Sequence, residues 1–184
     1  YCHLLLFKKF YYCIYYNIWS TIILKIYMKN TKEILLKIMY SALNASKPEG
    51  NFNYIPSKPE GKTIVLGAGK ASASMAKAFE KTYPHKLEGL VITRYGHKDK
   101  TKFINVLEAS HPIPDINGLN ATKKIIKLAK NASQKDLVIF LISGGASALL
   151  FSPAEGISFQ EKQNINDMLL KSGAPITEMN IVRQ

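Results

Sequence analysis

The sequence predicts an α/β fold: a layered, Rossmann-like sheet of mostly parallel strands with helices on both faces. Short apolar runs rich in β-branched residues alternate with helical stretches between residues 63 and 172, an order typical of parallel sheets. The run 136–142 is apolar on both faces, as a central parallel strand requires. Glycine-rich turns directly follow two of the runs, at the strand ends where such sheets bind ligands.

Residues 1–27 differ in composition from the rest of the chain. They contain both cysteines, the single tryptophan and six of the ten tyrosines, but no acidic residue. The uncharged run 10–24 is shorter than the ~18–20 residues that span a bilayer, and no small-residue cleavage site follows it. We interpret this atypical N-terminal extension as translated upstream sequence before a start at Met28, in preference to an export or membrane segment.

Residues 28–184 are predicted to form one α/β domain. A first helix, 31–44, has apolar residues at helical spacing and Thr31 as its cap, and a proline-containing linker follows at 47–61. The expected strands are 63–66, 87–93, 103–109 and 136–142. The later helices are expected at 70–83, from a cap at Asp115 or Asn117 to about 131, just before Pro153, at 158–172 behind a Ser158–Glu161 capping box, and from about 177.

Composition narrows the range of functions. The formal charge of +12 comes mostly from scattered lysines, with only two arginines in the chain, so we expect no nucleic-acid partner. From Met28 onward there is no cysteine. This excludes a disulfide framework, a cysteine zinc site and a cysteine nucleophile from the predicted domain.

The first glycine turn, Gly67-Ala68-Gly69, joins the strand 63–66 to a helix expected to start at Lys70. Glycines let backbone N–H groups approach a ligand, and a helix N-terminus attracts anions. A bound phosphate or carboxylate would also relieve the unfavourable position of Lys70 at the positive end of the helix dipole. The alternative is a tight turn with a solvated lysine, and the residues alone leave both open.

The second glycine turn, Ser143-Gly144-Gly145-Ala146-Ser147, is a second candidate anion site. Consecutive glycines can form a nest of N–H donors, and the serine hydroxyls add to it. The alternative is a strand-to-helix turn with a serine cap. In a parallel sheet both turns and the loop 110–115 lie at one edge, so we expect them to line one cleft.

Other polar residues are candidates with an equally plain structural alternative. His111 is a candidate general base or substrate ligand, or a structural hydrogen-bonding group in a proline-rich loop. Asp115 is interpreted as a helix cap in preference to a metal ligand, and no metal ligands are assigned. Asn180 and Arg183 are three residues apart on one helix face, placed either to reach an anion together or to form a solvated face.

Two familiar phosphate-binding motifs are excluded. The P-loop requires a glycine five residues before its Gly-Lys pair and a Ser or Thr after it, where this chain has Ile64 and Ala71. The dinucleotide-binding turn requires a third glycine and an acid at the end of the second strand. This chain has Ser72 and Thr93-Arg94 there, so an NADP-type site would rest on Arg94 alone.

Four motifs together resemble the glycerate 2-kinases, whose N-terminal domain is known as DUF4147 and whose C-terminal half is called the MOFRL domain. They are the segments 65–71, 108–115, 141–150 and 180–183, which stand in the same order as in that family. The resemblance covers roughly residues 28–184. It implies transfer of a phosphoryl group from ATP, with Mg²⁺, to the 2-hydroxyl of D-glycerate, giving 2-phosphoglycerate.

The resemblance also implies residue roles. Lys70 matches a catalytic, phosphate-contacting lysine, and His111 and Arg183 match further positions that we assign to catalysis. The predicted phosphate- and substrate-binding residues are Gly67, Gly69, Ser143, Gly144, Gly145, Ser147 and Asn180. Ala146 stands where the family usually has a third glycine. The MOFRL half is absent, so we expect an incomplete domain with little or no kinase turnover of its own.

The resemblance further implies a cytoplasmic protein that binds ATP and D-glycerate without a nucleic-acid or membrane partner, and it leaves a homodimer open. Two alternatives remain. One is an NAD(P)H-dependent hydroxypyruvate reductase, a name that some members of the family have carried. The other is a truncated, non-catalytic remnant that only binds anions or partners.

Overall fold

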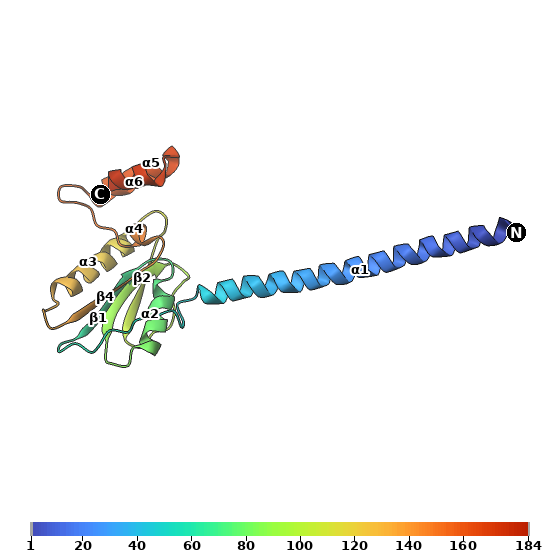
Figure 1. Ribbon diagram of the computed structural model, residues 1–184. Helices are drawn as coiled ribbons and strands as arrows, with labels where there is room; N and C mark the ends of the chain where they lie inside the picture. Colours follow the sequence, from blue (N-terminus) through green and yellow to red (C-terminus); the bar gives the residue numbers. More distant parts are fainter. Residues whose placement is uncertain (1, 184) are drawn as a thin grey trace. The chain divides into compact units, whose positions relative to one another are not determined.

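A computed structural model describes the backbone of residues 2–183 and the side chains of residues 21–23 and 25–182. The chain divides into two compact units, Tyr1–Lys47 and Pro48–Gln184. The first unit is the helix α1 (Cys2–Ala45), drawn in blue in Figure 1. This helix passes through Met28 and Thr31 without a break. Thr31 is therefore not a cap, and its hydroxyl donates to the carbonyl oxygen of Tyr27 one turn earlier (2.8 Å).

The described part of α1 is apolar around much of its circumference. Ile23, Ile26, Leu35 and Ile38 are among its many exposed side chains. Nevertheless, within the residues that the structure describes, no helix has both the length and the apolar character needed to cross a membrane.

The second unit is built on a parallel four-stranded sheet, which confirms the predicted fold class (Figure 1). The strands lie in the order β3-β2-β1-β4, and in register Leu66 stands beside Leu90 on one side and Phe140 on the other. The strands are β1 (Thr63–Ala68), β2 (Glu88–Arg94), β3 (Ile104–Ala109) and β4 (Leu137–Ile142).

Helices cover both faces of this sheet, as predicted. Figure 1 shows α2 (Ser72–Thr82) on one face and α3 (Ile116–Lys130) on the other. Asp115 caps α3 by accepting the N–H of Gly118 (2.8 Å). The remaining helices are α4 (Ala146–Leu149), α5 (Phe159–Ser172), which begins with the predicted capping box, and α6 (Ile176–Arg183).

The core consists of two apolar layers, one on each face of the sheet. Val65 and Val91 point toward α2 and pack with Phe79, whereas Leu66 and Ile92 point toward α3. These strand residues are almost completely buried, and full burial of each large apolar side chain contributes about 1.5–3 kcal/mol. Burial on both faces explains why β1 and β2 read as continuous apolar runs.

The expectation that residues 136–142 form a central strand is wrong for the described chain, because β4 lies at the sheet edge with β1 as its single neighbour. Its Ile139 and Leu141 pack into the layer beneath α2. On the α3 face, Val138, Phe140 and Ile142 remain 39, 43 and 62% exposed. An apolar run shows that both faces of a strand suit burial, but it does not reveal how many strands flank it.

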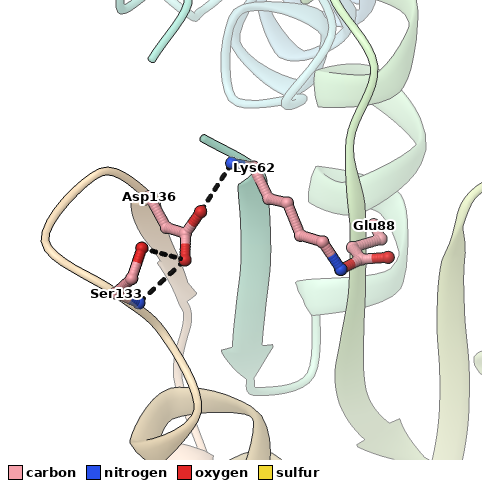
Figure 2. A network of polar contacts seen from close by, with 4 residues as sticks. All are labelled: Lys62, Glu88, Ser133 and Asp136. Atoms are coloured by element: carbon pink, nitrogen blue, oxygen red, sulfur yellow. Dashed lines mark hydrogen bonds and ion pairs between the residues drawn. The ribbon is translucent and has the colours of Figure 1, made fainter. Parts of the chain in front are cut away.

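A polar network holds β1 and β4 together at their amino-terminal ends (Figure 2). The Asp136 carboxylate accepts the backbone N–H of Lys62 (2.6 Å) and both the N–H and the hydroxyl of Ser133 (2.8 and 2.9 Å). The Lys62 ammonium pairs with Glu88 of β2 (2.9 Å). The hydrogen bond from the Lys62 N–H, followed by those from Ser133, lowers the pKa of Asp136 below its usual value.

Replacement of the Asp136 carboxylate should destabilise the fold at neutral pH more than at acidic pH. A depressed pKa in the folded state stabilises the fold above the unfolded value of 3.8, and this contribution disappears as the pH falls through the folded value. Asp136→Asn should therefore lower the free energy of unfolding at neutral pH and make less difference in acid. Urea unfolding across the pH range measures this.

The matched control for this prediction is Asp167→Asn, which removes a carboxylate that pairs with Lys171 within α5. We expect the control to change stability little, because exposed pairs of this kind contribute about 0–1 kcal/mol. A decrease in the free energy of unfolding of Asp136→Asn that is the same at every pH would contradict the prediction.

Candidate functional site

The loops that follow β1, β3 and β4 meet at the carboxyl edge of the sheet, as the sequence predicts. The Lys70 N–H donates to the Gly144 carbonyl oxygen (2.9 Å), which joins the loop after β1 to the loop after β4. A Cβ added to Gly145 would lie 2.7 Å from the His111 Nε2 atom, so the loop after β3 reaches the same place. Three segments far apart in the sequence thus form one site.

The backbone amides of the first turn are already used within the protein. The N–H of Gly69 donates to Ile92 of β2 (3.0 Å), and that of Ala71 donates to the Ser143 hydroxyl oxygen (2.9 Å). The N–H of Ser72 donates back to Gly69 (3.2 Å). Together with Lys70, four consecutive amides have internal acceptors. The helix α2 begins at Ser72 and not at Lys70 as expected, because Ala71 has a non-helical backbone with φ −108° and ψ 4°.

Gly67 and Gly69 have a steric role in the structure. A Cβ at Gly67 would overlap the Leu141 carbonyl oxygen of β4, and a Cβ at Gly69 would overlap Ser143. Gly69 also has a φ of +136°, which favours glycine. Their predicted contact with a ligand rests on the sequence alone, because the amide of Gly69 points to β2.

The second turn, unlike the first, has backbone N–H groups that are available to hydrogen-bond a ligand. Among the described residues, no acceptor bonds to the N–H groups of Gly144, Gly145, Ala146 and Ser147. Gly145 is in the left-handed region with a φ of +86°, and such a residue within a turn helps successive N–H groups to converge. The four amides form a candidate anion-binding nest.

Two side chains complete this nest. The Lys70 chain lies along the turn, with Cε 3.7 Å from the Cβ position of Gly144 and Cγ 3.3 Å from that of Gly145. Lys70 is exposed, and the described residues include no ion-pair partner for it. The Ser143 oxygen accepts the N–H of Ala71, which leaves the hydroxyl hydrogen for another acceptor.

His111 is half-buried beside Gly145. Burial, and then the positive charges of Lys70 and Arg94, hold the pKa of His111 below its usual value. The imidazole is consequently neutral near pH 7, and a neutral imidazole has one nitrogen that accepts a hydrogen bond or a proton.

The structure does not gather every predicted site residue. Asn180 is exposed on α6, and within the described chain no hydrogen bond joins it to Lys70, His111 or the second turn. Arg183 is the last residue of α6, and its side chain lies outside the described residues. Ser147 belongs to the second turn through its amide, and it also lines a cavity of about 530 Å³ that residues of α3 and α5 line.

Two buried polar residues that support the site were not predicted as site residues. Ser72 and Thr93 are both 0% exposed. The Ser72 hydroxyl lies 2.7 Å from the Ile92 carbonyl oxygen and 2.9 Å from that of Gly69, and the Thr93 hydroxyl donates to the Lys70 carbonyl (3.4 Å). Their positions in the sequence could have indicated this role, because Ser72 stands at the third glycine of the dinucleotide-binding pattern and Thr93 stands where that pattern has its acid.

Loss of the Ser72 hydroxyl should loosen the first turn. Ser72→Ala removes a buried donor from the carbonyl groups of Ile92 and Gly69, each of which keeps one backbone N–H, and should lower the free energy of unfolding by about 1 kcal/mol. Ser74→Ala in the same helix removes only a local bond to Ala71 and should be nearly neutral. Chemical denaturation of the two variants checks the difference, and equal stability would refute the role given to Ser72.

A side chain at Gly145 should disturb His111. Gly145 and Gly156 share a left-handed φ of +86° and +83°, so alanine at either position costs about 1–2 kcal/mol of backbone strain. Gly145→Ala also presses on His111, whereas nothing lies within 4 Å of a Cβ at Gly156.

We therefore expect Gly145→Ala to lose about 1 kcal/mol or more beyond Gly156→Ala, and to shift the His111 ring resonances in NMR spectra. Equal losses in the two variants, with unshifted His111 resonances, would mean that the two residues are not packed together as described.

Comparison with known proteins finds a matching family and relatives over most of the chain. The family model described as a domain of unknown function, DUF4147, matches residues 31–184. A protein of Agrobacterium vitis named as a hydroxypyruvate reductase is 42% identical over 157 residues, which cover 84% of this chain and 36% of that protein. A D-glycerate 2-kinase of Thermotoga maritima is 35% identical over 159 residues, covering 85% and 38%.

A solved structure supports the same relationship. The crystal structure of a glycerate kinase from Thermotoga maritima matches with a TM-score of 0.73 and 34% identity, over 84% of this chain and 38% of that protein. The chain thus spans little more than a third of the length of these relatives.

Proposed function

Because the chain belongs to the DUF4147 family, we propose that it is the phosphate-binding domain of a D-glycerate 2-kinase. The reaction is transfer of a phosphoryl group from ATP to the 2-hydroxyl of D-glycerate, giving 2-phosphoglycerate. Relatives from Thermotoga maritima and Pyrococcus horikoshii that are named as glycerate 2-kinases support this proposal. Since the chain covers 28–38% of those proteins, we expect these 184 residues alone to have little or no turnover.

The observation that carries the proposal is the second turn with Lys70 above it. Four N–H groups without acceptors among the described residues belong to one turn, and the side chain of Lys70, which has no ion-pair partner there, lies along it. Phosphoryl transfer is achieved mainly by positioning and by stabilising negative charge, and donors fixed in place before the ligand arrives suit that task. Lys70 would hold phosphoryl oxygens as charge moves from the attacking to the leaving oxygen.

His111 is proposed as the group that receives the hydroxyl proton. In the reaction the 2-hydroxyl oxygen bonds to the γ-phosphorus, the bond between that phosphorus and the bridging oxygen of ADP breaks, and the hydroxyl proton must leave. A neutral imidazole can take this proton, and the lowered pKa of His111 keeps it neutral. The nearby Lys70 then favours prompt loss of the proton from the imidazolium.

Mg²⁺ enters the proposal with the nucleotide, and no residue of this chain is assigned as its ligand. In the described part of the chain, no group of three or more His, Cys, Asp or Glu side chains could hold a metal ion. Mg²⁺ commonly binds through substrate phosphates and only one or two carboxylates. When bound there, it would neutralise phosphate charge.

The name of a relative favours the reductase alternative, but the geometry of the site gives it little support. A dinucleotide pyrophosphate binds the amides of the first turn in Rossmann proteins, and here Gly69, Lys70, Ala71 and Ser72 give those N–H groups to internal acceptors. Arg94 remains as a cation, but the turn has no amide left to hold the pyrophosphate.

Binding to the 184-residue chain tests the kinase proposal directly. Isothermal titration calorimetry should detect ATP with Mg²⁺, and Lys70→Ala should weaken its binding by at least about tenfold, because a charge-assisted hydrogen bond is lost. Lys81→Ala, which removes an exposed lysine from the other end of α2, should change the affinity by less than about twofold.

Three outcomes would count against the proposal. Equal ATP affinity in Lys70→Ala and the parent would remove the role of Lys70. Oxidation of NAD(P)H with hydroxypyruvate would favour the reductase. Absence of any ATP binding would favour a non-catalytic remnant.

A further inference from the structure

Arg94 is the last residue of β2 and is exposed at the edge of the sheet that carries the site. Side chains alternate along a strand, and Ile92, two residues earlier, packs into the layer beneath α3. Arg94 therefore emerges on the α3 face, the same face on which α4 follows the second turn and contributes Leu149 to that layer. The residue lies in register with Ala109, directly before the loop that contains His111.

The path of the His111 loop brings Arg94 into the site. His111 follows β3 at one edge of the sheet, yet its ring lies against Gly145, which follows β4 at the opposite edge. The second turn reaches back over the end of β1, where Gly144 accepts the Lys70 N–H, so it meets the His111 loop over the strands that lie between the two edges. Lys70 follows β1 and Arg94 ends β2, so both cations lie on the strands over which the two loops meet. In agreement, both charges act on the imidazole of His111.

The acids around Arg94 are occupied by other donors. Glu108 accepts the N–H of Gly96 (2.8 Å), and Asp115 accepts both the Tyr95 hydroxyl (2.6 Å) and the N–H of Gly118. No ion pair to Arg94 occurs in the described portion of the chain. The surrounding loop is thus fixed by its own bonds while the guanidinium is left unpaired.

From this placement we infer that Arg94 binds the carboxylate of the hydroxy-acid substrate, while Lys70 and the second turn bind phosphate. The inference rests on the proposed function. An arginine fork matches the two oxygens of a planar carboxylate, whereas a lysine acts as a point charge. A carboxylate at Arg94 and a phosphate at Gly144 would place the carbon chain of the substrate across His111, where its hydroxyl is needed.

Calorimetric titrations of the 184-residue chain with D-glycerate and, separately, with ATP and Mg²⁺ test this assignment. Arg94→Gln should weaken D-glycerate binding by at least about tenfold and ATP binding by less than about twofold. Arg94→Lys, which keeps the charge and loses the fork, should recover only part of the affinity. Lys98→Gln, an exposed cation four residues later in the same loop, is the control and should leave both affinities unchanged.

An independent readout is the titration of His111 by NMR. Arg94→Gln should raise the pKa of His111, because a nearby positive charge is removed, whereas Lys98→Gln should not. Unchanged D-glycerate binding in Arg94→Gln, an equal loss of ATP binding, or failure of the unmodified chain to bind D-glycerate would each overturn the inference. ATP binding that is lost in Lys70→Ala but kept in Arg94→Gln would leave the kinase proposal standing, so the two failures are distinguishable.

Discussion

The site depends on the hydrogen bonds that tie the start of α2 to its neighbouring loops. The N–H of Gly69 donates to β2, and those of Lys70 and Ala71 donate to Gly144 and Ser143 after β4. A backbone N–H has one hydrogen to donate, and a buried one must be paired. These bonds hold two turns together that are more than 70 residues apart in the chain. They also decide which turn still has amides to offer a ligand, because the first turn has none.

The two glycine turns consequently have different tasks. The first turn acts as a support: its glycines permit close approach of Leu141 and Ser143, its amides form internal bonds, and it delivers the Lys70 side chain. The second turn has four N–H groups that lack acceptors among the described residues, and it is the turn at which we propose that phosphate binds. Ser72 and Thr93 fasten the support to β2 from the buried side. A ligand would meet donors held in place by bonds that do not involve the ligand, an arrangement that avoids reorganisation during reaction.

The charged side chains of the candidate site are two cations, Lys70 and Arg94. Lys70 and Arg94 have no ion-pair partner in the part of the chain described. Burial, and then these two positive charges, lower the pKa of His111. A neutral imidazole between cations can accept a proton, and an anionic ligand would balance the positive potential around it. The strand that precedes the second turn, β4, is also an edge of the sheet in the described chain and presents Phe140 and Ile142 to solvent. The site therefore lies next to an uncovered apolar surface.

The amino-acid sequence by itself determined the element types, the parallel sheet with helices on both faces, the capping box at Ser158 and the two turns flanking the site. It narrowed the cap of α3 to Asp115 or Asn117. These follow from local spacing, from glycine and proline positions and from side-chain capping, which act over a few residues. Tertiary structure alone decided that β4 is an edge strand, that α1 continues through Thr31, and that Ser72 and Thr93 are buried supports. It also decided that the amides of 69–72 have acceptors while, within the described residues, those of 144–147 have none. Strand order and hydrogen-bond partners join residues far apart in the chain, and no local pattern specifies which acceptor a given N–H will meet.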